Sequence, residues 1–350
     1  MTYRVAVIGL GLMGDVSIAG LQKSGAFEVV AACDINVERA REVAASRGVA
    51  KVYTDADALI ANEELDLLAI ATPPDTHRHL SEAGFARGWH ILCEKPAAMN
   101  TAEAEQMLAA QKASGRIGVI DHELRFNPVR TKLQRLIAEG YIGRPRHAHL
   151  WSISAGMWEM SKWTWWSTTE HGGGLLGEVA SHQVDQLRWY LGDVAAARGR
   201  IHTFTTERAD AAGAVKPVTS DDYAALSLTF KSGALAEVVL SAAGGSNAGR
   251  RIEIHGDGGS LALDVDERLW GWKAGATEPE ELTEPEPMES LIGYPGDYYS
   301  PAYLRLVEAL AIGMMEGHHP HPAATFEDGL AIQKILDSAR TGTGHEIAVG

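Results

Sequence analysis

Glu178, His182 and Asp185 are separated by four and three residues in the stretch HGGGLLGEVASHQVD, which spans 171–185. On a helix this spacing places the three side chains on one face. A stripe of two carboxylates and an imidazole has three interpretations: a metal site, an acid–base site, or the solvated face of an ordinary helix. A histidine is well suited to proton transfer near neutral pH.

Metal binding explains the stripe least well. Glu178 and His182 supply two ligands, whereas a catalytic zinc site normally has three protein ligands and a water. The histidine-rich GHHPHP at 317–322 is expected to be a loop between two helices. The solvated face is also disfavoured, because Leu187 and Trp189 continue the pattern of a packed helix. We therefore expect no metal, and a pocket wall that carries acid–base chemistry.

A glycine-rich turn near the N-terminus predicts a dinucleotide site. GLGLMG at 9–14 follows the β-branched run RVAVI and precedes a helical pattern. In this context Gly9 permits the tight turn, Gly11 lets the backbone approach the pyrophosphate, and Gly14 permits close helix packing. A tight turn followed by a buried aspartate is the alternative, but it leaves the agreement of strand, glycines and helix unexplained.

Asp34 ends the next strand, 20 residues beyond Gly14. Its carboxylate would accept hydrogen bonds from the adenosine ribose and would repel a 2′-phosphate. Because Ile35 and Asn36 offer no cation, NAD is favoured over NADP.

Alternating helices and strands continue to about residue 120 and predict a doubly wound parallel sheet. Ligands in such sheets bind at the carboxyl ends of the strands. Those ends are Thr72–Pro73, Glu94–Lys95–Pro96 and Asp121–His122–Glu123. The expected helices are 37–47, 77–87 and 101–114, and the expected strands are 65–70, 89–94 and 117–120. The cofactor-binding candidates are Gly9, Gly11, Leu12, Met13, Gly14, Asp34, Ile35, Thr72, Pro73, His77, Glu94 and Lys95.

The pattern changes after residue 121, which predicts a Rossmann domain at 1–121 and an α+β domain at 122–350. Hairpin turns at 231–234 and 256–259 indicate a large, mostly antiparallel open sheet. Its uncovered face predicts a homodimer or homotetramer. The acidic stretch 277–290 is expected to be an exposed loop. The expected helices are 128–139, 301–316 and 326–340, and the expected strands are 146–154, 197–206, 223–230, 235–242, 250–255 and 260–264.

The composition excludes several classes of protein. The formal net charge of −15 over 350 residues argues against a nucleic-acid partner. No apolar run reaches the roughly 20 residues that span a bilayer. The N-terminal MTYRVAVIG lacks a secretory segment. Cys33 and Cys93 stand in separate apolar runs, as expected of packed thiols in a reducing compartment. A soluble cytoplasmic protein is the expectation.

Four stretches of the sequence point to one known family: GLGLMG, CEKP, HGGGLLGEVASHQVDQLRWYLG and PAATFEDGLAIQKILDSARTG. Over nearly its whole length the chain resembles the glucose–fructose oxidoreductase and inositol dehydrogenase family (Gfo/Idh/MocA). The family's E-K-P motif is complete, and so is its R-F-x-P element at 125–128. In its D-x-G-x-H-x-x-D motif Glu178 replaces the aspartate and Ala180 the glycine. Glu123 stands where asparagine is common. The resemblance implies an NAD-dependent dehydrogenase or reductase acting on a ring hydroxyl of a sugar, inositol or related polyol.

The resemblance also implies roles for the stripe. His182 would be the acid–base residue, and Lys95 would hydrogen-bond the reacting oxygen and stabilise its negative charge. Glu178 would accept a hydrogen bond from a substrate hydroxyl or from His182. Its extra methylene places the substrate farther away or displaces the helix. Asp185 is expected to be structural.

Other aromatic and polar residues are weaker candidates. Of the tryptophans Trp158, Trp163, Trp165 and Trp166, we expect one or two, such as Trp165 and Trp166, to line a sugar pocket. His122 and Glu123 either border the nicotinamide or anchor a loop. His77 and His79 begin a helix and are expected at the surface, and Arg125 is expected to pair with a carboxylate. Two alternative functions stay open: an NAD-cycling epimerase or glycoside-cleaving enzyme, and a nucleotide-dependent sensor.

Overall fold

The computed structural model describes residues 2–155, 161–284, 286, 289–293, 297–341 and 347–348. The chain forms two compact units. Unit 1 comprises Met1–Asn127 and Pro287–Leu330, and unit 2 comprises Pro128–Glu286 and Ala331–Gly350. A single boundary after residue 121 is therefore an incomplete description, because the segment 287–330 returns to the N-terminal unit.

Unit 1 is built on a seven-stranded sheet in the order β17-β6-β5-β4-β1-β2-β3. All neighbours run parallel except β17, which is antiparallel to β6. This arrangement confirms the doubly wound fold predicted from the sequence. The strands are β1 (Tyr3–Ile8), β2 (Phe27–Cys33), β3 (Lys51–Tyr53), β4 (Leu67–Ile70), β5 (His90–Cys93), β6 (Gly118–Ile120) and β17 (Ala324–Thr325).

Helices cover both faces of this sheet, and each face has its own apolar core. Val5 and Val7 of β1 belong to one core, whereas Ala6 and Ile8 belong to the other, as the period-two alternation of a strand requires. All of β4 is buried, as predicted. The helices of unit 1 are α1 (Leu12–Lys23), α2 (Val37–Arg47), α3 (Ala56–Asn62), α4 (His77–Ala86), α5 (Thr101–Ser114), α8 (Ser300–Glu316) and the first residues of α9 (Phe326–Arg340).

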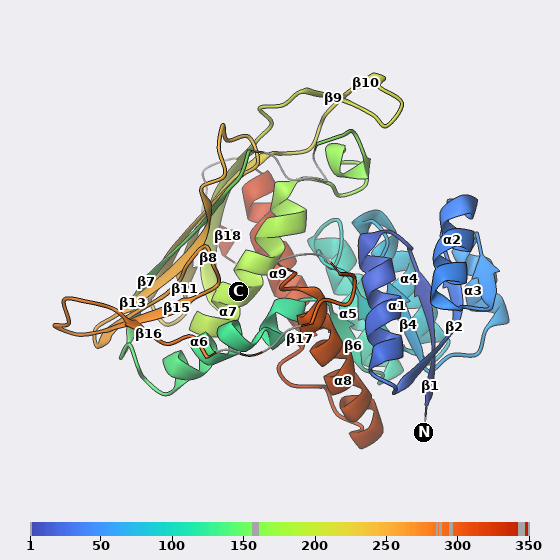
Figure 1. Ribbon diagram of the computed structural model, residues 1–350, viewed down its shortest axis with the longest axis horizontal. Helices are drawn as coiled ribbons and strands as arrows, with labels where there is room; N and C mark the ends of the chain where they lie inside the picture. Colours follow the sequence, from blue (N-terminus) through green and yellow to red (C-terminus); the bar gives the residue numbers. More distant parts are fainter. Residues whose placement is uncertain are drawn as a thin grey trace. The chain divides into compact units, whose positions relative to one another are not determined.

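Unit 2 is built on a nine-stranded sheet in the order β16-β15-β14-β13-β7-β12-β11-β8-β18. Every pair is antiparallel except β7 and β12. Helices α6 (Pro128–Ala138), α7 (Ser181–Leu191) and the later part of α9 lie on one side of it (Figure 1). The strands are β7 (Pro145–Ile153), β8 (Val194–His202), β11 (Tyr223–Phe230), β12 (Leu235–Ser241), β13 (Gly249–Gly256), β14 (Gly259–Leu263), β15 (Leu269–Lys273), β16 (Glu280–Glu281) and β18 (Ile347–Ala348).

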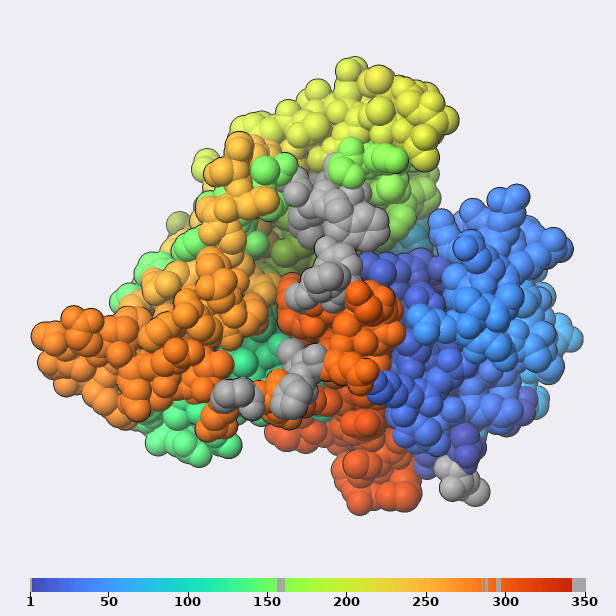
Figure 2. All heavy atoms as spheres, viewed as in Figure 1, coloured from blue at the N-terminus to red at the C-terminus, as the bar shows by residue number. Residues whose placement is uncertain are grey.

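Several elements differ from the sequence prediction. β8 begins at Val194, three residues before the expected 197, and β15 was not predicted. Glu280–Glu281 forms the edge strand β16 inside the acidic stretch expected to be a loop. The hairpin of β9 (Glu207–Ala209) and β10 (Val215–Pro217) was also missed; its segment extends beyond the end of the large sheet (Figure 1) and is yellow at the top of Figure 2. No helix in the part of the chain that the structure describes is long and apolar enough to cross a membrane.

Candidate active site

The turn between β1 and α1 requires two of its three glycines for packing. Gly9 has φ +89°, and a Cβ there would lie 2.4 Å from the Ala71 carbonyl oxygen. A Cβ on Gly14 would lie 1.9 Å from the Gly9 oxygen. Gly11 differs, because no heavy atom of the described residues lies within 4 Å of its hypothetical Cβ. Gly11 also begins α1 without a side-chain cap, which leaves amide donors and open space for an anion.

Asp34 ties this turn to the end of β2. Its Oδ2 accepts the Leu10 N–H at 2.8 Å, and its Oδ1 accepts the Asn36 N–H at 2.8 Å. Ile35 is exposed. The half-exposed Arg39 places Nη1 3.7 Å from Asp34 Oδ2. This cation in the first turn of α2 was not predicted, because Arg39 lies beyond the two residues that directly follow Asp34.

His77 is buried, so the expectation that it lies at the surface is wrong. Its Nε2 lies 2.8 Å from the Thr72 carbonyl oxygen and its Nδ1 lies 3.0 Å from the Pro96 carbonyl oxygen. Burial lowers the pKa of His77, and these backbone contacts oppose that effect. The ring therefore connects the loop after β4 to the loop after β5. His79 is exposed, as expected, and contacts Asp57 at 2.7 Å.

The ends of β5 and β6 bring Glu94 and Asp121 together. These strands are neighbours in the sheet, and both carboxyl side chains are buried. Burial raises the pKa of Asp121 well above its ordinary value, and the charges of Glu94 and Glu123 add to this effect. The half-buried Lys95 follows Glu94 at the same strand end. His122 and Glu123 are buried after β6.

The stripe from the sequence analysis begins in a wide helical turn. Leu176–Ala180 is π-helical and leads into α7, so the angle between Glu178 and His182 differs from that of a regular α-helix. Glu178 and Asp185 are buried and His182 is half-buried. A Cβ on Gly174 would lie 2.4 Å from Asp221 Oδ1, and Asp221 Oδ2 accepts the Leu176 N–H at 2.8 Å. Gly174 therefore leaves room for the Asp221 carboxyl group, which holds the backbone of Leu176 at the start of this turn.

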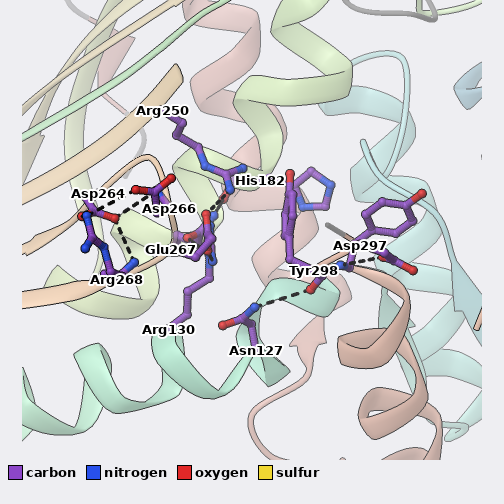
Figure 3. A network of polar contacts seen from close by, with 12 residues as sticks. Asn127, Arg130, His182, Arg250, Asp264, Asp266, Glu267, Arg268, Asp297 and Tyr298 are labelled. Atoms are coloured by element: carbon purple, nitrogen blue, oxygen red, sulfur yellow. Dashed lines mark hydrogen bonds and ion pairs between the residues drawn. The ribbon is translucent and has the colours of Figure 1, made fainter. Parts of the chain in front are cut away.

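A buried network of ion pairs and hydrogen bonds contacts the backbone of α7, and it was not predicted from the sequence. Arg130 of α6 is wholly buried and donates from Nε to Gln186 Oε1 at 2.8 Å. The Gln186 amide in turn donates to the His182 carbonyl oxygen at 3.3 Å. Arg130 and Arg250 converge on Glu267 (Figure 3). Burial raises the pKa of Glu267, but the charges and hydrogen bonds of the two arginines outweigh it and lower the pKa to about 2.

The remaining candidates are less well placed for chemistry. Trp165 and Trp166 are half-buried with ring centroids 5.7 Å apart, and Trp166 packs against the core. Trp163 donates to the Pro217 carbonyl oxygen at 2.9 Å, whereas Trp158 lies outside the described residues. Arg125 pairs with a carboxylate, Asp328, at 3.4 Å, as predicted. Across the described part of the chain, no group of three or more His, Cys, Asp or Glu residues could hold a metal ion.

Family models match both halves of the chain. Residues 3–122 match the model for the oxidoreductase family with an NAD-binding Rossmann fold, and residues 131–262 match the GFO/IDH/MocA C-terminal domain. The chain belongs to the Gfo/Idh/MocA oxidoreductase family. The family, the fold class, the enzyme class and the NAD cofactor predicted from the sequence are confirmed.

Relatives of this Gfo/Idh/MocA protein include sugar dehydrogenases. It is 30% identical to levoglucosan dehydrogenase of Pseudarthrobacter phenanthrenivorans over 76% of this chain and 74% of that protein. It is 28% identical to 1,5-anhydro-D-fructose reductase of Ensifer adhaerens over 99% of each chain. Among solved structures, an oxidoreductase domain protein from Kribbella flavida has a TM-score of 0.87 at 28% identity, covering 100% of both chains. Levoglucosan dehydrogenase with NADH has a TM-score of 0.89 at 22% identity, which shows the shared fold.

Proposed function

We propose that this protein is an NAD-dependent dehydrogenase that oxidises a ring hydroxyl of a sugar, inositol or related cyclic polyol. The observation that carries the proposal is the position of Lys95 at the carboxyl end of β5, in the same parallel sheet as the glycine turn and Asp34. Ligands of such sheets bind at this edge. The activities named for levoglucosan dehydrogenase and 1,5-anhydro-D-fructose reductase support the substrate class.

The cofactor side of the site has the features that NAD requires. The open space at Gly11 and the uncapped start of α1 suit the pyrophosphate, and Asp34 suits the ribose hydroxyls. Leu12, Met13, Ile35, Thr72 and Pro73 border the same strand ends. His77 acts here indirectly, because its ring holds the loop that carries Thr72. NAD supplies the hydride acceptor when it is bound.

Lys95 and His182 both act on one substrate oxygen, and each has a different role. Alcohol oxidation removes a hydroxyl proton while a hydride leaves the carbon. His182 takes that proton, because an imidazole can be neutral at the working pH and still bind a proton. Lys95 donates a hydrogen bond to the same oxygen and stabilises its developing negative charge. Both residues must be fixed before reaction, and the Arg130–Gln186 contact to the α7 backbone serves His182 in this way.

Glu178 selects and orients the substrate in this proposal. Its carboxylate accepts a hydrogen bond from a second substrate hydroxyl or from His182. The π-helical turn determines where the longer glutamate side chain ends. His122, Glu123, Trp165 and Trp166 are further candidates for contact with substrate.

A screen for NADH formation tests the function. Inositols, aldoses and glycosides are incubated with the protein and either NAD or NADP. Net NADH accumulation with a cyclic polyol supports a dehydrogenase, whereas substrate conversion without net NADH indicates the NAD-cycling alternative. Absence of any conversion, together with NAD binding, favours the sensor.

Lys95→Met and His182→Ala test the roles of the two residues. Each is expected to lower kcat by about 10²–10⁴-fold, the range for losing a positioned acid–base group. The dissociation constant for NAD, measured by titration calorimetry, should change little. Full turnover by both variants would refute the assignment.

The open face of the nine-stranded sheet supports a homodimer or homotetramer. Trp151 of β7 pairs with Val239 of β12, and both are half-exposed. Burying this pair against a second copy would stabilise an assembly. Light scattering that gives the mass of one chain would contradict it. The free, buried Cys33 and Cys93 support the proposed cytoplasmic location, which cell fractionation tests.

A further inference from the structure

Glu94 and Asp121 lie next to one another because the sheet keeps them in register. Cys93 of β5 pairs with Ile120 of β6, and the Asp121 N–H donates to the Cys93 carbonyl oxygen at 2.7 Å. The next residues on the two strands therefore come side by side. Their carboxyl groups lie within hydrogen-bonding reach of each other. Only 7% of Glu94 and 1% of Asp121 is exposed, so bulk water hardly reaches the two groups.

A hydrogen bond between two carboxyl groups requires a proton, because ionised carboxylates only accept. Glu94 Oε1 and Asp121 Oδ1 are buried, and neither has a hydrogen-bond donor among the described residues. Glu94 Oε2 differs, since it accepts the Lys95 N–H at 3.2 Å. One proton shared by the two carboxyl groups would supply a donor that these buried oxygens lack. The pair then carries one negative charge.

The surroundings favour this single negative charge. Burial raises the pKa of both carboxyl groups, and the neighbouring acid Glu123 raises that of Asp121 further. The charges of both acids also act on the Tyr303 hydroxyl of α8 and on the Cys93 thiol. Burial raises the pKa of each, and both acids of the pair add to that effect, so neither contributes a second negative charge. Lys95 is the cation that lowers the pKa of both acids.

We propose that Glu94 and Asp121 hold one proton between them at neutral pH and that this acid pair positions Lys95 and balances its charge. A second proton would remove the negative charge of the pair from beside the ammonium group. Loss of the shared proton would place another negative charge beside the substrate oxygen, which must itself become negative. Both residues act through Lys95. The functional part of this inference rests on the proposed function, whereas the shared proton does not.

Infrared spectroscopy tests the shared proton without substrate. At about pH 8 the wild-type protein should show the carbonyl stretch of a buried carboxylic acid, since coupled carboxyl pairs retain a proton well above the ordinary carboxyl range. Asp121→Asn and Glu94→Gln should each remove this band, because an amide donates the hydrogen bond that the proton supplied. Glu63→Gln is the matched control: Glu63 is equally buried, but Lys51 and Tyr53 bind it and its pKa is lowered. The band should survive in that variant.

The pH dependence of kcat tests the coupling to Lys95. In the wild type kcat should fall on the alkaline side as the pair loses its proton. Asp121→Asn leaves the pair with a single negative charge at every pH at which Glu94 is ionised. The fall in kcat at alkaline pH should therefore move to higher pH or disappear. Thermal unfolding and NAD binding confirm that the variants fold. A missing band in the wild type, or a band unchanged in both variants, overturns the shared proton. An alkaline limb unchanged in Asp121→Asn overturns the link to Lys95, whereas an active Lys95→Met protein overturns only the proposed function.

Discussion

Replacing Glu267 with glutamine should destabilise unit 2 strongly and in a pH-dependent way. The substitution keeps the size of the side chain but removes the negative charge between Arg130 and Arg250. Arg130 is wholly buried, so the substitution removes the carboxylate charge opposite its guanidinium group where bulk water cannot replace it. Breaking one member of a buried ion pair is costly because the remaining charge stays out of water.

The magnitude follows from the lowered pKa of Glu267. A change from the ordinary 4.5 to about 2 corresponds to about 3 kcal/mol of folding free energy. The side chain is 23% exposed, which is low enough for most of this to be retained. Because the folded pKa is depressed, the contribution is complete above the unfolded pKa and is lost as the pH falls toward about 2. The free energy of unfolding of the wild type should exceed that of Glu267→Gln by about 3 kcal/mol at neutral pH and by about 1.4 kcal/mol near pH 3.

Urea unfolding followed by tryptophan fluorescence measures this difference. Trp89 is the one tryptophan of the nine that belongs to unit 1, so the signal reports mainly on unit 2. Glu237→Gln on the exposed face of β12 serves as the control and should change stability by less than about 0.5 kcal/mol. A Glu267→Gln effect below about 1 kcal/mol, or one equal at both pH values, would refute the reasoning.

Two further predictions concern the cofactor side. Asp34→Ala should weaken NAD binding about 10- to 100-fold, which is the range expected for lost hydrogen bonds to a charged group. It should also relax the discrimination against NADP, because the carboxylate that faces Arg39 beside the ribose site is then absent. Calorimetric titration with both cofactors measures it, and an unchanged preference contradicts the ribose role. Gly14→Ala should cost at least about 1–3 kcal/mol in thermal or urea unfolding, because its methyl group meets the Gly9 oxygen. Gly11→Ala should leave stability nearly unchanged but weaken NAD binding; equal effects of the two alanines on stability would contradict the separate roles.

Elements with strong local signals could be predicted from the sequence. α2 and α5 have the expected bounds, because each is a run of good helix formers that an asparagine cap precedes and a glycine follows. The weak elements depend on partners. β16 consists of two glutamates, and only its pairing with Trp270 and Gly271 makes it a strand. A two-residue edge strand carries no periodicity, so its sequence resembles a loop.

The candidate site was predictable only in part, for a similar reason. The carboxyl ends of parallel strands lie at one edge of a sheet, and Glu94, Lys95 and Asp121 could therefore be placed there from the predicted strands alone. The contacts of Arg130 with Glu267 join residues 137 positions apart, and no local pattern announces them. Glu267 also has φ +59°, which a sequence argument does not assign to a glutamate. His77 was misjudged because the carbonyl groups that bind it come from two separate loops.

The formal charge of −15 counts every carboxyl group as ionised, and the buried acids show why that count fails locally. Glu267 faces two arginines and keeps its charge to low pH, whereas Asp121 faces other acids and its pKa rises. Burial raises the pKa of both groups and Asp121 is the more buried, but the two arginines reverse the direction at Glu267, whereas the neighbouring acids reinforce it at Asp121. At the edge of the parallel sheet, the shared proton proposed for Glu94 and Asp121 leaves one negative charge beside Lys95 instead of two. In the proposed reaction, a substrate oxygen that loses its proton would then meet an ammonium group whose charge the acids behind it balance and do not exceed. We expect this balance to let Lys95 stabilise the alkoxide.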